Sequence, residues 1–199
     1  DISPNGCIPT VGSMQASFAS LMLASQLDPK RDTVLYIDPG FPVQKMQAQV
    51  IGVKIASFDI AEYRGDKLEE KLESYFAQGN ICAVLYSSPN NPTWMCLKDE
   101  ELEIIGRLAT KHDVVVIEDL AYMTMDFRRD MSRPFQPPFQ PSVSKFTDNY
   151  ILLISASKIF SYAGQRIAVA CISDALYNRA YDSLKQRYGI ARFGAAFAY

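Results

Sequence analysis

Apolar residues follow two alternating patterns along the chain, helical spacing and short continuous runs. Between residues 13 and 27, Phe18, Leu21 and Met22 have helical spacing, and this pattern stops at Asp28-Pro29. The same reasoning predicts helices over residues 42–51, 66–78, 98–111 and 174–192. The short apolar runs predict buried strands over residues 33–37, 53–58, 81–86, 114–117, 150–154 and 167–172.

The predicted strands are apolar throughout and alternate with helices, which is typical of a mostly parallel sheet covered by helices on both faces. We therefore expect the α/β class with a doubly wound sheet, and 199 residues are enough for one such domain with a substantial core. Ligands of these sheets bind at the carboxyl ends of the strands. Polar residues at that edge are the first candidates for a functional site.

The composition excludes several classes of partner and compartment. With 20 Lys and Arg against 22 Asp and Glu, the chain has no basic field, so we expect neither nucleic acid nor a membrane as a partner. No apolar run approaches the roughly 20 residues that span a bilayer. The four cysteines form no CxxC pair, and Cys82 and Cys171 lie in apolar runs, so we expect reduced thiols and a cytoplasmic protein. The chain starts at Asp1 without methionine or a signal pattern, which indicates a fragment or a processed protein.

Two segments and the single histidine have mainly structural interpretations. The Pro-rich residues 134–141 predict an extended surface loop, with a ligand for a proline-reading domain as the alternative. On the helix 174–192, a solvated face explains Arg179, Lys185 and Arg187 at least as well as a binding surface does. His112 lies in a polar helix end, a poor place for a catalytic triad or a zinc cluster, so we expect a structural histidine and no metal site.

Polar residues follow three of the predicted strands. They read Ser87-Ser88-Pro89-Asn90-Asn91-Pro92-Thr93, then Glu118-Asp119-Leu120-Ala121-Tyr122, then Ser155-Ala156-Ser157-Lys158, with Gly164-Gln165-Arg166 further on. Each alone is better explained as a turn or a helix cap. Together, in this order and at strand ends, they form a specific constellation.

This constellation resembles the class I/II aminotransferases, which are fold-type I enzymes dependent on pyridoxal 5'-phosphate (PLP). SPNNPT resembles the family's Asn-Pro-Thr-Gly loop, DLAY its Asp-x-x-Tyr, and SASK with GQR its Ser-x-x-Lys and Gly-x-Arg segments. The resemblance runs from about residue 12 to residue 168. The chain departs from the family at Trp94, where a glycine is usual, and at Ala168, two residues after the arginine, where a glycine is common.

The resemblance implies roles for the residues around the cofactor ring. Lys158 would hold PLP as a Schiff base from a polar, partly buried position, and its freed amine would then act as a general base. Asp119 would face the pyridine nitrogen and keep it protonated. Asn91 and Tyr122 would hydrogen-bond the phenolate oxygen, and Phe41 would stack on the ring, with a core aromatic as its alternative.

The phosphate of the cofactor needs fixed donors and positive charge. The amides of Ser13 and Met14 lie at the start of the first predicted helix, where the helix dipole favours an anion. Ser155 adds a hydroxyl and Arg166 a planar cation suited to bidentate contact. Ser157 is a further candidate donor, with less support than the others.

The resemblance also implies what lies around this chain. We expect residues 1–199 to be the PLP-binding large domain, with the family's N-terminal arm and C-terminal small domain outside it. The expected function is transfer of an amino group between an amino acid and a 2-oxo acid by a homodimer. Two alternatives stay open, a PLP-dependent lyase or decarboxylase, and an aminotransferase-like sensor domain of a regulator. The arginine that binds the substrate carboxylate in the family lies in the small domain, so the sequence assigns no substrate.

Overall fold

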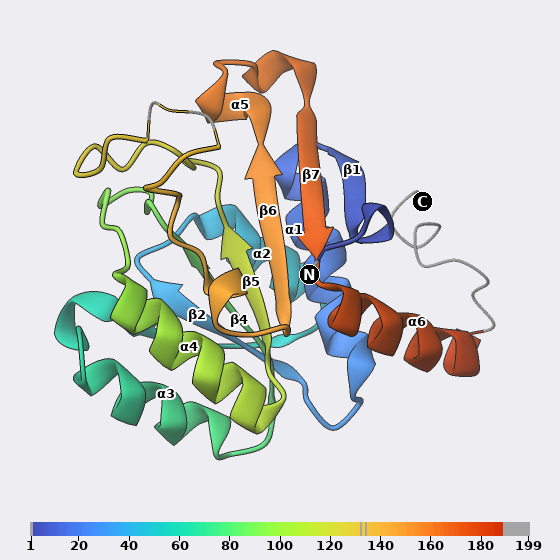
Figure 1. The fold of residues 1–199 in the computed structure, drawn as a ribbon. Helices are drawn as coiled ribbons and strands as arrows, with labels where there is room; N and C mark the ends of the chain where they lie inside the picture. The colour runs from blue at the N-terminus through green and yellow to red at the C-terminus, as the bar shows by residue number, and fades with distance from the viewer. Residues whose placement is uncertain (1, 132, 134, 189–199) are drawn as a thin grey trace.

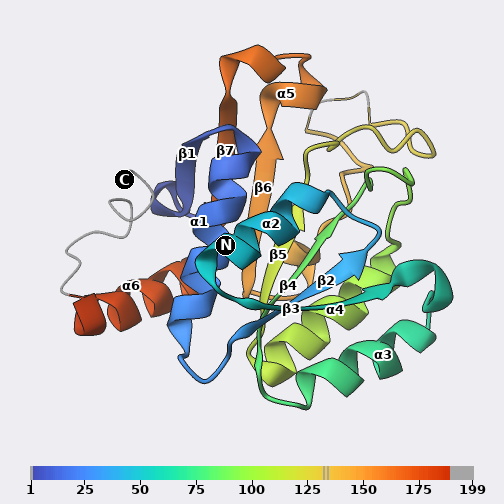
Figure 2. The same cartoon turned by 180° about the vertical axis from the view of Figure 1, so that it is seen from behind.

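The computed structural model describes residues 2–131, 133 and 135–188, which form one sheet with helices on both faces (Figures 1 and 2). The strands are β1 (Cys7–Val11), β2 (Thr33–Asp38), β3 (Lys54–Asp59), β4 (Ile81–Ser87), β5 (Val115–Asp119), β6 (Tyr150–Ser155) and β7 (Ile167–Ile172). The helices are α1 (Gly12–Leu27), α2 (Pro42–Ile51), α3 (Lys67–Phe76), α4 (Asp99–His112), α5 (Ala156–Ile159) and α6 (Asp174–Tyr188). Short 3-10 helices are η1 (Pro4–Gly6), η2 (Ile60–Glu62), η3 (Val143–Lys145) and η4 (Ala163–Gln165).

The strands form a seven-stranded sheet in the order β1-β7-β6-β5-β4-β2-β3. The five strands from β6 to β3 are parallel, as predicted, and β7 pairs antiparallel with both β6 and β1. The α/β class and the mostly parallel sheet are confirmed. Strand β1 was not predicted, because it has only five residues and contains Pro9, which cannot donate to a ladder and is tolerated on an edge strand.

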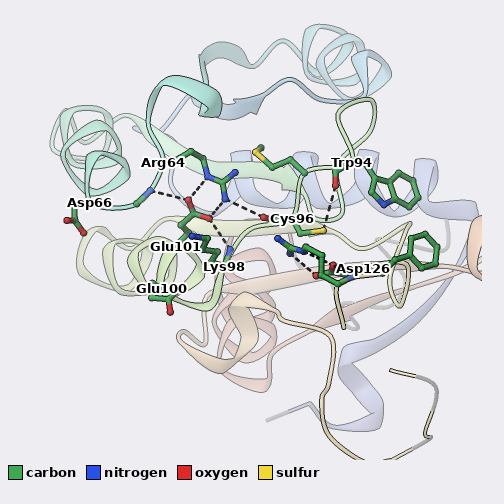
Figure 3. Close-up of a pocket in the computed structure, with 12 residues that line it drawn as sticks. Arg64, Asp66, Trp94, Cys96, Lys98, Glu100, Glu101 and Asp126 are labelled. Atoms are coloured by element: carbon green, nitrogen blue, oxygen red, sulfur yellow. Dashed lines mark hydrogen bonds and ion pairs between the residues drawn. The ribbon is translucent and has the colours of Figure 1, made fainter. Parts of the chain in front are cut away.

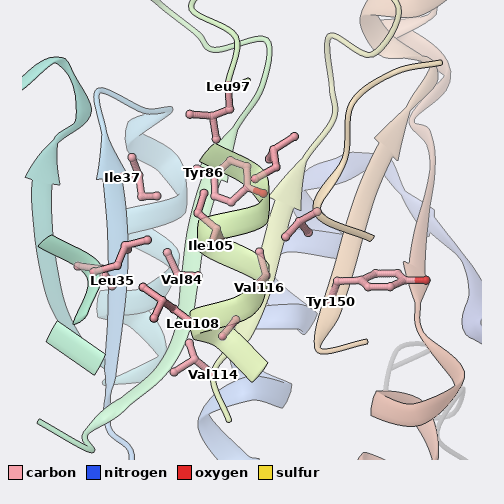
Figure 4. Packing of buried hydrophobic residues seen from close by; sticks show 14 of the residues in the cluster. Leu35, Ile37, Val84, Tyr86, Leu97, Ile105, Leu108, Val114, Val116 and Tyr150 are labelled. Carbon is pink, nitrogen blue, oxygen red and sulfur yellow. The ribbon is translucent and has the colours of Figure 1, made fainter. Parts of the chain in front are cut away.

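Each face of the sheet has its own apolar core. On one face, α1 contributes Ala16, Leu21 and Leu23 to a cluster with residues of the central strands and of α6. Half of the residues of α1 are buried, because this helix packs on the sheet and also contacts α2 and α6. On the other face, α3 contributes Leu72 and α4 contributes Ile105 to a second cluster with residues of the sheet. Figure 4 shows Ile105 and Leu108 of α4 beside residues of the strands. Burial on both faces explains why the inner strands β2, β4, β5 and β6 are apolar along most of their length.

Several element boundaries differ from the predicted ones by one or two residues, whereas α2 has the predicted bounds. Helix α2 is capped by Gly52, which has φ 82°, and α4, which ends one residue later than predicted, is capped by Asp113, which has φ 53°. Both caps have the left-handed conformation typical of a helix C-terminus. The last helix is described to residue 188, so the predicted residues 189–192 lie outside the described residues. The Pro-rich residues 135–141 have no helix or strand, as predicted.

Other sequence expectations have the following outcomes in the described part of the chain. No described helix is long and apolar enough to cross a membrane. Among the described residues, no three His, Cys, Asp or Glu side chains form a group that could hold a metal ion. Cys82 and Cys171 are buried free thiols, as predicted. His112 Nε2 donates a hydrogen bond to the Glu73 carboxylate at 3.0 Å, and its ring packs on Phe76, which is the structural role expected.

Candidate active site

The topology brings the ends of five segments to one edge of the sheet. Strands β4, β5 and β6 are parallel, so Ser87, Asp119 and Ser155 at their carboxyl ends lie on this edge. Ser87 is directly opposite Asp119, and Ser155 lies two residues beyond Leu153, the residue opposite Asp119 on β6. Because β7 is antiparallel to β6, its first residue lies at the same edge, directly after Arg166. Strand β1 is antiparallel to β7, so its last residue also reaches this edge and leads into Gly12. The antiparallel strands therefore bring Gly12 and Arg166, which are 154 residues apart in the sequence, to the same edge.

A cavity of about 250 Å³ opens at this edge. Every residue predicted above to bind the cofactor lines this cavity, namely Ser13, Met14, Phe41, Asn91, Asp119, Tyr122, Ser155, Lys158 and Arg166. The other lining residues are Ser87, Ala121, Ser157 and Ala163. The structure thus brings together residues that are up to 153 positions apart in the sequence.

Asp119 is the buried carboxylate of the cavity. Its side chain is only 5% exposed, and it accepts hydrogen bonds from the Ala121 amide at 3.0 Å and from Gln44 Nε2 at 2.7 Å. Burial raises the pKa of Asp119 to about 6, although both hydrogen bonds act in the opposite direction. A cation placed against this carboxylate would favour its ionised form.

Gln44 contacts Asp119 but is not among the site residues predicted from the sequence. It lies in the first turn of α2, is 2% exposed, and its own carbonyl accepts a 3.0 Å hydrogen bond from the Tyr36 hydroxyl. Both its side chain and its backbone are thereby fixed, so Gln44 orients the carboxylate of Asp119. The available signal was its spacing of four residues from Ala48, which places a polar side chain on the buried face of the predicted helix.

Gly12 and Arg166 are packed against each other at another part of the cavity wall. Gly12 has φ 75°, and a Cβ atom built on it would lie 2.1 Å from Arg166 Nη2. Only glycine therefore allows the guanidinium to occupy this place. Arg166 Nη1 also donates to the Ala163 carbonyl at 2.7 Å, which fixes the direction of the side chain.

Lys158 lies on the one-turn helix α5, and Ser155 is the last residue of β6, directly before this helix. The Ser155 hydroxyl caps this helix by accepting a hydrogen bond from the Ser157 amide at 3.1 Å. Lys158 lines the cavity but its side chain is exposed, so the expectation of a partly buried lysine is wrong. The physical reason is the position of α5, which follows the end of β6 beyond the core and contacts β7 and the short η4 segment at the edge of the fold (Figure 1).

The loop after β4 is tied to the loop after β2. Asn90 is buried and donates from Nδ2 to the Pro39 carbonyl at 2.7 Å and to Ser87 Oγ at 3.1 Å. This link joins the segment that bears Asn91 to the segment that bears Phe41, and both residues line the same cavity. Phe41 is 37% exposed, so its alternative interpretation as a core aromatic is wrong.

A larger cavity, of about 890 Å³, lies beside the loop after β4 (Figure 3). Its two guanidinium groups are already bound by buried carboxylates. Arg64 contacts both oxygens of Glu101 at 2.5 and 2.6 Å, and Arg128 contacts both oxygens of Asp126 at 2.8 Å. These pairs hold loops in place, so the smaller cavity is the better candidate for chemistry.

Comparison with known proteins gives a consistent result. The sequence profile of the family "Aminotransferase class I and II" matches residues 3–198. The aspartate aminotransferase of Thermotoga maritima is 30% identical over 176 residues, which cover 87% of this chain and 44% of that protein. The glutamate-pyruvate aminotransferase AlaC of Escherichia coli is 29% identical over 170 residues, covering 84% of this chain and 39% of that protein.

A solved structure shows the same fold. The crystal structure of the aspartate aminotransferase from Thermotoga maritima matches with a TM-score of 0.71 at 24% identity, covering 100% of this chain and 50% of that chain. The chain spans less than half the length of the curated relatives described above.

Proposed function

The chain belongs to the class I and II aminotransferases, and we propose that it binds pyridoxal 5'-phosphate in the cavity at the carboxyl edge of its sheet. In the whole protein, this site would transfer an amino group between an amino acid and a 2-oxo acid. The observation that carries the proposal is the convergence of a lysine, a buried carboxylate and an arginine, Lys158, Asp119 and Arg166, in one cavity.

The donors around the cavity fit the phosphate of this cofactor. Ser13 and Met14 belong to the first turn of α1, where free amides and the helix dipole favour an anion. The Ser155 hydroxyl and the Arg166 guanidinium line the same cavity, and the missing Cβ of Gly12 leaves room for the guanidinium. A lysine in place of Arg166 would bind as a point charge and lose the bidentate contact.

The remaining residues fit the ring. Asp119 would hold a proton on the ring nitrogen, because a cation beside this buried carboxylate compensates the cost of its burial. Gln44 keeps the carboxylate in one orientation. Asn91 and Tyr122 would donate hydrogen bonds to the phenolate oxygen, and Phe41 would lie on the face of the ring.

When bound, the cofactor supplies an electron sink for negative charge on the Cα atom of an amino acid. Lys158 would hold the cofactor covalently through Nζ as a Schiff base. Once a substrate amine displaces it, Lys158 Nζ would take a proton from the substrate Cα and return one, the task of a general base. The exposed position of Lys158 leaves its amine accessible to both partners.

The lysine assignment has a direct test. We expect borohydride reduction of the protein mixed with PLP, followed by peptide mapping, to place the reduced cofactor on Lys158. Lys111 and Lys145 are the internal controls, because both are exposed and neither lines the cavity. Reduced cofactor on either of them, with Lys158 unmodified, would contradict the proposed site.

We also propose the context in which the site works. In this proposal, the chain is the large domain of a protein that forms a cytoplasmic homodimer. The N-terminal arm and the small domain belong to other parts of the same protein. Its substrates are an amino acid and a 2-oxo acid, as the names of the relatives above indicate for those proteins. The test is an amino-donor screen on the full-length protein with detection of the 2-oxo acid product. Consumption of many equivalents of donor per site without a 2-oxo acid acceptor would indicate a lyase or a decarboxylase instead.

A further inference from the structure

Trp94 occupies the position where the family usually has a glycine in its Asn-Pro-Thr-Gly loop. The structure gives Trp94 a φ of 61°, the left-handed conformation in which a glycine is favoured and a bulky residue is strained. The turn is nevertheless closed, with the Trp94 amide donating to the Asn90 carbonyl at 2.8 Å and the Asn90 amide donating to the Met95 carbonyl at 2.8 Å. The chain therefore keeps the backbone geometry of a glycine turn and adds a large aromatic ring to it.

This ring contacts two other aromatic side chains. It makes an edge-to-face contact with Tyr122, with ring centroids 5.3 Å apart and planes at 67°. It also stacks on Phe127, with centroids 6.1 Å apart and planes at 9°. Trp94 is 42% exposed and Phe127 is 81% exposed, so Phe127 is the outer member of the group. Both arrangements are favourable geometries for aromatic pairs.

Tyr122 connects this aromatic group to the cofactor cavity. Tyr122 lines the smaller cavity, whereas Trp94 and Phe127 line only the larger one (Figure 3). Within the described residues, no hydrogen bond is formed by the Tyr122 hydroxyl, so packing and not a polar partner sets the direction of this side chain. The closest ring contact that Tyr122 makes is with Trp94.

We infer that Trp94 is a positioning residue that holds the Tyr122 ring so that its hydroxyl points at the cofactor oxygen. The inference rests on the proposed function, in which Tyr122 donates to that oxygen. It gives a reason for a strained tryptophan in a turn that a glycine would satisfy, because the ring restrains a side chain that otherwise has no fixed partner. Trp94 does not touch the cavity, so its effect must pass through Tyr122.

The first experiment measures the pH midpoint of the absorbance change of bound PLP. A hydrogen bond to the phenolate oxygen lowers the pKa of the imine next to it, so Tyr122→Phe should raise this midpoint. We expect Trp94→Gly to raise it by at least half as much, and Trp94→Phe, which keeps an aromatic ring, to restore most of the original value. In the double variant with Tyr122→Phe, Trp94→Gly should add nothing, because its only route of action is gone. Phe127→Ala is the matched control and should shift the midpoint less than Trp94→Gly does.

An unchanged midpoint in Trp94→Gly, or a shift that adds fully to that of Tyr122→Phe, would overturn the inference. Thermal unfolding accompanies each variant, and Trp94→Gly should fold well because glycine suits φ 61°.

The second experiment needs no cofactor. Crystal structures of Trp94→Gly and Trp94→Phe without PLP should show the Tyr122 ring displaced in the first and retained in the second. An unmoved Tyr122 ring in Trp94→Gly would overturn the inference even if PLP binds at Lys158. Conversely, if PLP and borohydride do not modify Lys158 in the wild-type protein, the proposed function is overturned. The position of the Tyr122 ring in the variant structures would still test the role of Trp94.

Discussion

At the scale of single residues, Gly12 and Arg166 compete for the same small volume. A Cβ on Gly12 would lie 2.1 Å from Arg166 Nη2, and the backbone there has φ 75°. We predict that Gly12→Ala displaces the guanidinium and weakens PLP binding by about 10-fold, equal to about 1.4 kcal/mol, the order of one charge-assisted contact. A fluorescence titration with PLP measures the loss, since Trp94 is the only tryptophan of the chain.

Gly52→Ala is the matched control for this prediction. Gly52 has a similar φ of 82°, but nothing lies within 4 Å of the Cβ that the substitution adds. Both variants therefore carry backbone strain, and only Gly12→Ala meets Arg166. We expect both to lose stability and only Gly12→Ala to lose PLP affinity. Equal affinities in the two variants would argue against a phosphate contact by Arg166.

Glu118 is a second buried carboxylate, next to Asp119 in β5, and it has no cationic partner among its hydrogen bonds. It accepts from Ser142 Oγ at 2.6 Å, from the Val143 amide at 3.1 Å and from the Tyr86 hydroxyl at 3.3 Å. Burial raises the pKa of Glu118 from 4.5 to about 7. Because the folded state holds this proton more tightly than the unfolded state, the stability that it gives is complete below pH 4.5 and is lost as the pH rises towards 7.

We predict that the free energy of unfolding decreases between pH 4.5 and 7 and that Glu118→Gln removes much of this decrease. Urea unfolding at several pH values measures it. Asp119→Asn is the comparison, because the pKa of Asp119 is raised from 3.8 to about 6 and its contribution is lost over that lower range. The same pH slope in Glu118→Gln and in the wild type would show that Glu118 ionises freely in the folded protein.

At the scale of secondary structure elements, the sequence predicted those elements whose apolar pattern reports a buried face. Strands such as β4 are buried along their length, and helices such as α3 bury one stripe of apolar residues, so both patterns are strong. Strand β1 alternates between exposed and buried residues over only five positions, and its antiparallel partner β7 is 156 residues away in the sequence, measured from Val11 to Ile167. Its pairing depends on the tertiary fold, which local patterns do not contain.

The register of β1 can be tested through two cysteines. It places Cys7 directly opposite Cys171, and a hydrogen bond with the Cys7 thiol adds to the burial that raises the pKa of Cys171 to about 11. Residues directly opposite on antiparallel strands have Cβ atoms about 4.5 to 5.5 Å apart, near the range of a disulfide. We predict that a mild oxidant such as diamide links Cys7 to Cys171, with loss of two hydrogens in the peptide map, while Cys82 stays free.

The outcome of this oxidation distinguishes the register from its neighbours. A slip of one residue would move Cys7 to the opposite face of the sheet, away from Cys171. Cys7→Ser should abolish the linked peptide without changing the other cysteines. A linked peptide that instead joins Cys7 to Cys96, or no intramolecular link at all, would show that β1 does not pair with β7 in this register.

At the scale of the whole molecule, the candidate site could be predicted because strand ends of one sheet share an edge. That rule needs only the position of each polar motif relative to a strand, and it was enough for Asp119 and Ser155. It could not find Gln44, whose role depends on how α2 packs against β5, or the exposure of Lys158, which depends on what covers α5. Contacts between elements, rather than the elements themselves, set these properties.

The spread of the site over the chain makes cofactor binding a property of the whole fold. PLP would join the start of α1 to the loop before β7, so binding should stabilise the folded chain as a unit. At a concentration of 100 times Kd, a ligand of the folded state adds about 2.7 kcal/mol. For a chain of this size each kcal/mol raises the melting temperature by about 2–4 °C, so we predict a rise of about 5–10 °C with PLP, measured by thermal unfolding.

Two variants and a control measure how much of this rise in melting temperature depends on Lys158 and on Arg166. Lys158→Ala should keep part of it, because the phosphate donors remain, and Arg166→Ala should lose most of it at the same PLP concentration. Higher PLP should restore the rise in Arg166→Ala, since a phosphate contact acts as uniform binding that excess ligand replaces. Arg107→Ala is the control, because Arg107 forms an exposed ion pair with Glu69 far from the cavity lining and should respond as the wild type does. If Arg166→Ala and Arg107→Ala show the same rise in melting temperature, Arg166 does not hold the phosphate. If excess PLP cannot restore the rise in Arg166→Ala, Arg166 is needed for folding instead.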